Sequence, residues 1–299
     1  MTQPNGLLLV NKPKGWTSHD VVGRMRKIAG TKKVGHTGTL DPEATGLLPI
    51  TLGACTKLAQ YLTLDVKEYV FSMRLGAQTD TDDHTGQVVH TSDAGHVTRA
   101  QLEDALGVFS GEVMQRPPNY SAIRVNGQRA YALARAGVVF ELPERPVHVY
   151  ELELLEANLP DASLRLRCGA GTYVRSIARD LGLMLGTHGH STSIHRTGVG
   201  AFRVEDAVML EQLDADGVEP YLMPPGIMVD SLDAWDASAD EVEEIRFGRA
   251  IRVNIELEAD TLVAIFDAQH THLIAMARVE RLDEGVCLLK PKRVLQPHG

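Results

Sequence analysis

The sequence of 299 residues predicts an α+β fold with a mixed or antiparallel sheet, followed by a small β domain. Segments with helical and with strand periodicity both occur, but not in the strict alternation of a doubly wound sheet. Residues 210–236 are acidic and contain prolines, as expected of a connection. Four short strand-like runs follow, in about 60 residues, which is enough for a small domain to fold.

The N-terminal part predicts a strand, a helix and a second strand. Residues 6–13 form an apolar run that ends near a proline, as a strand does. Apolar side chains recur in residues 18–30 at the spacing of an amphipathic helix. Ser18 is the expected N-cap and Gly30 the expected stop. Residues 68–76 again have the pattern of a strand.

The middle of the chain combines regular elements with one long irregular segment. Thr98 and Gln101 have the spacing of a capping box, which predicts a helix over 98–109. Residues 115–146 are rich in proline, arginine and glycine and predict a long loop with one short helix, a kind of loop that is often functional. The other expected elements are strands over 146–156 and 163–168, a helix over 172–185, and C-terminal strands over 250–258, 261–268, 272–280 and 286–295.

Composition indicates a cytoplasmic protein that does not bind membranes. The three cysteines are odd in number and lack CxxC spacing, which is typical of a reducing compartment. No segment has the length of a transmembrane helix or the core of a signal peptide. The net charge of −9 argues against a nucleic-acid partner, but residues 1–60 carry eight basic and three acidic side chains, a local charge of +5. A basic region of this kind suits a polyanion, and charge alone equally suits a solvated helix face.

The segment GHTGTLDPEATGLLP, residues 35–49, contains the first candidate for chemistry. Asp41 precedes a proline, which favours an extended backbone, and the glycines allow turns and the close approach of another molecule. Asp41 is therefore either a turn residue or a nucleophile. Glu43 shares its face in an extended segment, as a pair of glycosidase carboxylates would, but we expect Glu43 to face solvent.

Motifs for metals and nucleotide cofactors do not fit the sequence. The glycine-rich segment lacks GK[ST], and no GxGxxG follows a strand. Residues 80–86 have the acidic pattern of a calcium loop, but His84 takes a ligand position and Thr85 stands where the turn needs glycine. There is no HExxH and no zinc-like cysteine and histidine spacing. We expect neither a metal nor a cofactor.

Five blocks occur in order along the chain: NKPKGWTSHDVV (11–22), VGHTGTLDPEATGLLPITLGACTK (34–57), KEYVFSMRLGAQTDTDDHTG (67–86), RPPNYSAIRVNGQRAYALARAG (116–137) and CGAGTYVRSIARDLG (168–182). Together they resemble bacterial TruB-type tRNA pseudouridine synthases, which isomerise the uridine at position 55 in the T-arm loop. The resemblance covers about Gly6 to Phe202 and implies the pseudouridine synthase fold with a mixed, largely antiparallel central sheet. It implies a catalytic domain over 1–232, with an RNA-binding insertion at about 115–146, and a PUA-like RNA-binding domain over 233–299.

The resemblance also implies roles for residues that match the family's motifs. Asp41 matches the catalytic aspartate. Tyr69 matches the tyrosine that stacks on the target base and helps to remove its C5 proton. Arg175 matches the arginine that pairs with the carboxylate and keeps it ionised, and His36 matches the histidine that meets RNA as the base is extruded.

Other matches complete the implied substrate site. Lys12 and Tyr173 match two further active-site positions. Ile194 stands where the family usually has a leucine against the uracil, a change that preserves apolar contact. Thr39 and Trp16 replace smaller residues, and neither change touches the implied chemistry.

The implied reaction breaks the C1′–N1 bond, turns the uracil and joins C1′ to C5, without redox change. One carboxylate suffices, as a nucleophile at C1′ or as a base at C2′ that gives a glycal, and the sequence leaves both routes open. The implied partner is the T-arm stem-loop of tRNA, bound by a monomer without a protein partner. Two alternatives stay open: a guide-RNA-dependent synthase of the archaeal and eukaryotic kind, and a non-catalytic RNA-binding protein.

Overall fold

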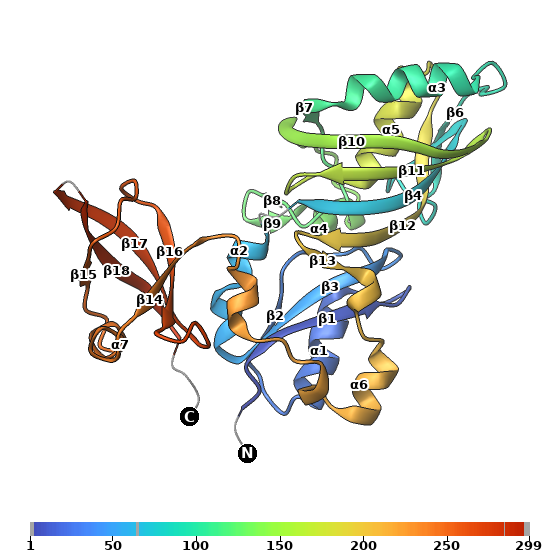
Figure 1. Ribbon diagram of the computed structural model, residues 1–299. Helices are drawn as coiled ribbons and strands as arrows, with labels where there is room; N and C mark the ends of the chain where they lie inside the picture. Colours follow the sequence, from blue (N-terminus) through green and yellow to red (C-terminus); the bar gives the residue numbers. More distant parts are fainter. Residues whose placement is uncertain (1–2, 64–65, 284, 296–299) are drawn as a thin grey trace.

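The computed structural model describes residues 3–63, 66–283 and 285–295 and has the predicted α+β fold. The ends of the two expected domains, residues 1–2 and 296–299, lie outside the described residues. A nine-stranded sheet forms the body of the molecule (Figure 1). Along the sheet its strands are β1 (Gly6–Lys12), β3 (Thr45–Leu52), β12 (Gly189–Val199), β4 (Lys67–Leu75), β11 (Asp161–Cys168), β10 (Arg145–Asn158) and β7 (Gly111–Gln115), with β2 (Val34–His36) paired to β3 and β13 (Phe202–Arg203) paired to β12.

The central sheet is mixed and largely antiparallel, as expected. β3 and β12 are parallel, with His195 opposite Thr45 and Arg196 opposite Gly46. The other neighbouring strands of this sheet run antiparallel. The parallel junction therefore joins the N-terminal part of the sheet, β1 to β3, to the part formed by β4, β11, β10 and β7.

Helices cover both parts of the sheet. α5 (Val174–Met184) packs against β12 and β4, and α3 (Arg99–Leu106) packs against β10. α1 (Ser18–Ile28) and α6 (Leu210–Asp216) lie beside the N-terminal strands (Figure 1). The other α-helices of the described residues are α2 (Ala59–Thr63), α4 (Ala130–Arg135) and α7 (Ala239–Arg246).

The caps agree with the sequence analysis for α3 and correct it for α1. Thr98 and Gln101 form the expected capping box. Thr17, not Ser18, caps α1: its hydroxyl accepts from the amide of Asp20 at 3.0 Å. The hydroxyl of Ser18 instead forms two hydrogen bonds with Leu40: it donates to the Leu40 carbonyl at 3.1 Å and accepts from the Leu40 amide at 2.8 Å. Ser18 thus ties α1 to the segment that carries Asp41.

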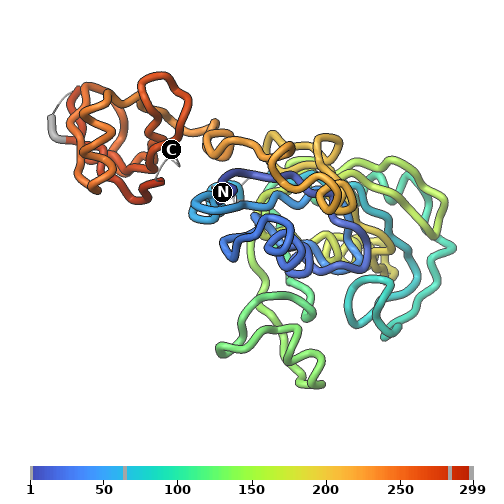
Figure 2. Tube along the Cα trace, turned by 90° about the horizontal axis from the view of Figure 1, so that it is seen from below, coloured from blue at the N-terminus to red at the C-terminus, as the bar shows by residue number. Residues whose placement is uncertain are grey.

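A second sheet of five strands forms the small C-terminal β domain. Its strand order is β14 (Asp233–Ala237), β16 (Leu262–Asp267), β17 (Leu273–Asp283), β18 (Val286–Val294) and β15 (Ile251–Val253), so the strand expected over 250–258 is shorter than expected. The domain lies beside the body (Figures 1 and 2). Phe266 and Met276 belong to an apolar cluster with Leu9, Leu47 and Met228 of the body, so the two parts share a packed contact.

The described residues contain neither a helix able to cross a membrane nor a group of three or more metal-ligating side chains.

Candidate active site

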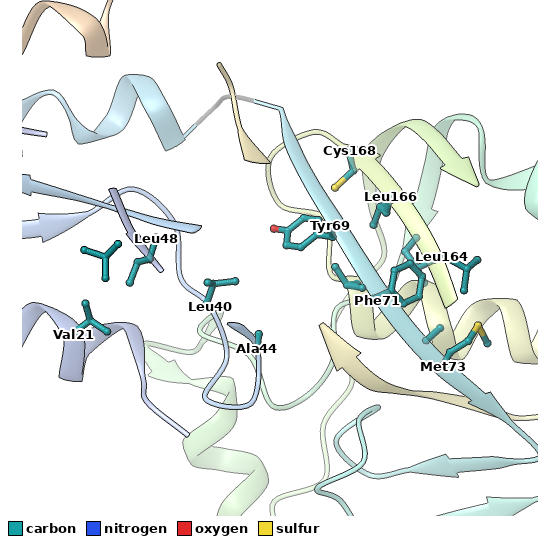
Figure 3. Close-up of a cluster of buried hydrophobic side chains, with 14 of the residues drawn as sticks. Val21, Leu40, Ala44, Leu48, Tyr69, Phe71, Met73, Leu164, Leu166 and Cys168 are labelled. Atoms are coloured by element: carbon teal, nitrogen blue, oxygen red, sulfur yellow. The ribbon is translucent and has the colours of Figure 1, made fainter. Parts of the chain in front are cut away.

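The loop between β2 and β3 presents Asp41 to solvent on a fixed backbone. Leu40 and Ala44, on either side of it, are buried in the main core (Figure 3). The amide of Ala44 donates to the carbonyl of Asp41 at 3.1 Å, and Ser18 holds Leu40 through two hydrogen bonds. The Asp41 side chain nevertheless keeps 40% of its surface exposed. Apolar anchors on both sides thus hold a carboxylate that can meet another molecule.

Arg175, in the first turn of α5, brings a positive charge to this carboxylate. Its Nε lies 2.9 Å from Oδ2 of Asp41, and its side chain is only 4% exposed. Its Nη1 and Nη2 donate to the carbonyls of Thr81 and Tyr120 at 2.8 and 2.9 Å. The Nε–H itself has no aligned acceptor, so the contact with Asp41 is an ion pair of short distance rather than a directed hydrogen bond. The guanidinium is fixed, while the carboxylate keeps freedom to turn.

Tyr69 occupies β4 at the border between the two parts of the sheet. It is opposite Arg196 on β12 and opposite Leu166 on β11. Its ring projects from β4 with the hydroxyl toward the side of the sheet that holds Leu40 and Leu48 (Figure 3). Burial raises the pKa of Tyr69, while the charge of Arg196 and a hydrogen bond from it act in the opposite direction. The hydroxyl is therefore protonated at neutral pH.

Lys12 lies behind the loop rather than on its open face. The amine donates to the carbonyls of Pro13, Trp16 and Pro42, at 2.9, 2.6 and 3.1 Å, and the residue is fully buried. Burial is the main cause that lowers the pKa of Lys12 to about 8, against the attraction of the Asp41 carboxylate. Lys12, which the resemblance implies for the substrate site, holds the backbone next to Asp41 in this structure.

His36, Tyr173 and Ile194 lie on three different elements. His36 ends β2, where its Nδ1 accepts from the amide of Gly38 at 3.3 Å; burial lowers the pKa of this histidine and favours its neutral form. Tyr173 is the N-cap residue of α5, and its ring centre lies 5.4 Å from the guanidinium carbon of Arg145. Ile194 on β12 packs against the main core.

The acidic turn 79–86 supports Arg175; the sequence analysis considered residues 80–86 as a calcium loop and rejected that interpretation. Asp83 lies 3.6 Å from Nη1 of Arg175, in addition to the hydrogen bond from Arg175 to the Thr81 carbonyl. Asp82 forms a buried ion pair with Arg179 at 2.8 Å, one turn along α5. The alternating acidic and threonine residues were the available signal, but only the fold reveals that they face α5.

Glu43, expected to face solvent, is one-third exposed and tied to its surroundings. Its carboxylate lies 3.2 Å from the amine of Lys14 and 3.4 Å from Nε2 of His84. The guanidinium of Arg175 instead meets the carboxylates of Asp41 and Asp83. Of the two carboxylates in the loop, Asp41 is the one that faces the buried guanidinium.

Comparisons with known proteins agree with this arrangement. Residues 26–174 match the model of the TruB family pseudouridylate synthase N-terminal domain, and residues 175–221 match the tRNA pseudouridylate synthase B C-terminal domain. The tRNA pseudouridine synthase B of Arthrobacter sp. (strain FB24) is 44% identical over 253 residues, which is 83% of this chain and 82% of that protein. The enzyme of the same name from Ruegeria pomeroyi is 46% identical over 82% of each chain. The chain belongs to the TruB family of pseudouridylate synthases.

Two solved structures extend the likeness of this TruB-family chain to its C-terminal domain. A Cbf5–Nop10–Gar1 complex contains a chain that is 27% identical, with a TM-score of 0.75. An H/ACA ribonucleoprotein bound to a substrate RNA containing 2′-deoxyuridine contains one that is 26% identical, with a TM-score of 0.74. Each match covers 98% of this chain and 85% of the other. The sheet of the body and the C-terminal β domain are thus both part of a known pseudouridine synthase architecture.

Proposed function

We propose that this chain converts the uridine at position 55 in the T-arm loop of tRNA to pseudouridine, with Asp41 as the reacting carboxylate and no cofactor. The observation that carries the proposal is the ion pair of 2.9 Å between the half-exposed Asp41 and the buried Arg175. A protein that only binds RNA does not need a carboxylate held in this way. The name of the relatives, tRNA pseudouridine synthase B, supports tRNA as the substrate.

The chemistry needs one carboxylate at the sugar and one acceptor for the C5 proton. Asp41 attacks C1′ and displaces N1 of the uracil, or removes the C2′ proton so that the uracil leaves and a glycal forms, while Arg175 stabilises the negative charge of the carboxylate. The uracil then turns, and C5 bonds to C1′ as the bond from Asp41 breaks or as the C2′ proton returns. C5 finally loses its proton and N1 gains one, so the reaction is an isomerisation. Tyr69 stacks on the base in this proposal. Its oxygen accepts the C5 proton as it passes its own proton to solvent, so the phenol is protonated before and after the step, and the positive charge of Arg196 stabilises negative charge on that oxygen.

The target uridine must leave the stack of its loop before Asp41 reaches C1′. Unstacking costs a few kcal/mol, which phosphate contacts and stacking on Tyr69 offset. We assign these phosphate contacts to the basic N-terminal region and to the insertion at about 115–146. The insertion carries β8 (Arg124–Val125), β9 (Gln128–Arg129) and α4, and it projects from the body as an arm (Figure 2). We also propose 1–232 as the catalytic domain and 233–299 as a second RNA-binding domain.

The test is to incubate a T-arm hairpin with the purified chain alone and to map pseudouridine in the product. The proposal expects a single pseudouridine at position 55, formed by a monomer without guide RNA or protein partner. A hairpin with cytidine at that position is the matched control. A guide-dependent enzyme gives no product under these conditions, and a non-catalytic protein binds the hairpin without changing it. Either result contradicts the proposal.

A further inference from the structure

Arg196 on β12 is a buried charge that the sequence analysis did not single out. Only 1% of the residue is exposed. It lies at the junction between the two parts of the sheet, opposite Gly46 of β3 on one side and Tyr69 of β4 on the other. The backbones approach closely there, because a side chain at Gly46, where φ is +98°, would collide with the carbonyl oxygen of Arg196. Arg196 is thus fixed against both strands.

The guanidinium of Arg196 spans the two ends of the loop that carries Asp41. Its Nε donates to the carbonyl of Leu47 at 2.7 Å, and its Nη2 donates to the carbonyl of Gly38 at 3.1 Å. Gly38 precedes Asp41 and Leu47 follows it in the chain. One planar side chain therefore sets the distance between the two stems of the loop, a task for which a forked donor is suited and a lysine is not.

Arg196 also acts on the titratable groups around the loop. Its hydrogen bond and its charge lower the pKa of Tyr69, against the larger effect of burial. Its charge adds to burial in lowering the pKa of His36 and of Lys12. Within the described part of the chain Arg196 forms no ion pair, so its cost of burial is offset by two backbone carbonyls and by the Tyr69 hydroxyl. An apolar side chain would pack there without that cost, but would not hold the loop.

We infer that Arg196 is a positioning residue, which fixes the spacing between the Asp41 carboxylate and the Tyr69 hydroxyl for the chemical step. Its guanidinium bonds to the Leu47 and Gly38 carbonyls of the loop and to Tyr69. The inference rests on the proposed role of Asp41. The inference predicts that Arg196 affects the rate at saturating RNA and not the affinity for RNA, because only 1% of the residue is exposed to a binding partner.

The test compares Arg196→Met and Arg196→Lys with Leu102→Ala, a control that removes buried apolar contacts on α3. Melting temperature, the dissociation constant for a T-arm hairpin and the single-turnover rate at saturating hairpin are measured for each. We expect Arg196→Met to bind within threefold of the parent chain and to react at least 100-fold more slowly. Arg196→Lys, which keeps the charge and the stem but not the fork, should recover part of that rate. Leu102→Ala should melt earlier and react within threefold of the parent.

The inference is overturned if Arg196→Met reacts within threefold of the parent chain, or if Leu102→Ala loses as much rate at an equal loss of melting temperature. Where Arg196→Met does not fold, Arg196→Lys decides: a tenfold slower reaction with unchanged binding supports the inference, and a rate within threefold contradicts it. Persistent activity of Asp41→Asn is a different outcome, which overturns the proposed function whatever the Arg196 variants do.

Discussion

Replacing Arg175 by methionine should slow the chemical step, because the Asp41 carboxylate loses its partner. The same change should also lower stability, and the two effects can be measured separately. The variant keeps an unbranched side chain and removes its charge and all its donors. The Nε to Oδ2 distance is 2.9 Å, but Asp41 is 40% exposed. An exposed ion pair contributes up to about 1 kcal/mol, and a hydrogen bond to a charged group about 1.5–3 kcal/mol. Because Arg175 is buried and Asp41 is 40% exposed, their ion pair should contribute about 1–2 kcal/mol. At about 1.36 kcal/mol per tenfold change, its loss slows the chemical step by roughly 5- to 30-fold.

The same change has a separate cost in stability. The carbonyls of Thr81 and Tyr120 lose the donors that reach them at 2.8 and 2.9 Å. Each buried acceptor left without a partner costs about 1–3 kcal/mol. In a domain of this size each kcal/mol lowers the melting temperature by about 2–4 °C. The variant should therefore melt clearly below the parent chain.

The assay is single-turnover release of tritium from a T-arm hairpin labelled at C5 of its uridines, at saturating protein. Arg179→Met is the matched control, because Arg179 lies one turn along α5 and bonds to Asp82 and to the carbonyl of Arg116 rather than to Asp41. The control should lose stability and keep its rate within threefold. Equal rates for Arg175→Met and the parent chain, or equal rate losses in both variants, would refute the reasoning.

The lysine behind the loop, the insertion and the buried thiols each give a further prediction. Lys12→Met should slow the reaction at least tenfold at pH 7, since three carbonyls lose their donor, among them that of Pro42 next to Asp41. In the parent chain the rate should fall as pH rises through about 8, where Lys12 loses its proton, and a pH–rate profile of Lys12→Met should lack that step. Affinity for a T-arm hairpin should fall steeply with salt, and titration of Arg124→Gln and Arg129→Gln should show a slope reduced by about 1 for each phosphate interaction that the substitution removes. Burial raises the pKa of Cys55 to about 12 and of Cys168 to about 11, so mass spectrometry should find both thiols unmodified by iodoacetamide at pH 8 until the chain is unfolded. A flat salt response, an unchanged pH profile or rapid alkylation of the folded chain would each contradict the corresponding prediction.

The elements with clear periodicity could be predicted from the sequence. The helices over 18–30 and 172–185 follow their apolar spacing, and the structure has α1 and α5 there. The C-terminal strands follow their apolar runs as well, although β15 is shorter than its run because Asn254 and the residues after it leave the sheet. The turn at residues 42–43 also followed from the proline and glycines around Asp41.

The strands next to the site could not be predicted in the same way. β12 carries buried polar residues such as Ser191 and Arg196, whose hydrogen bonds go to distant carbonyls, so its sequence lacks the apolar alternation of a strand. β3 is buried along almost its whole length and contains Pro49, which made it look like part of the glycine-rich loop. The support of Arg175 by the turn 79–86 depends on contacts across the fold, which local spacing does not encode.

The most direct test of the central claim is the amount of pseudouridine that Asp41→Asn forms in a T-arm hairpin that it still binds. Asparagine keeps the shape of the side chain and removes the negative charge that the chemistry requires. The account predicts binding within about threefold of the parent chain, a difference of about 0.7 kcal/mol, and no pseudouridine after prolonged incubation. Formation of pseudouridine at a rate near that of the parent chain would show that Asp41 is not the reacting group.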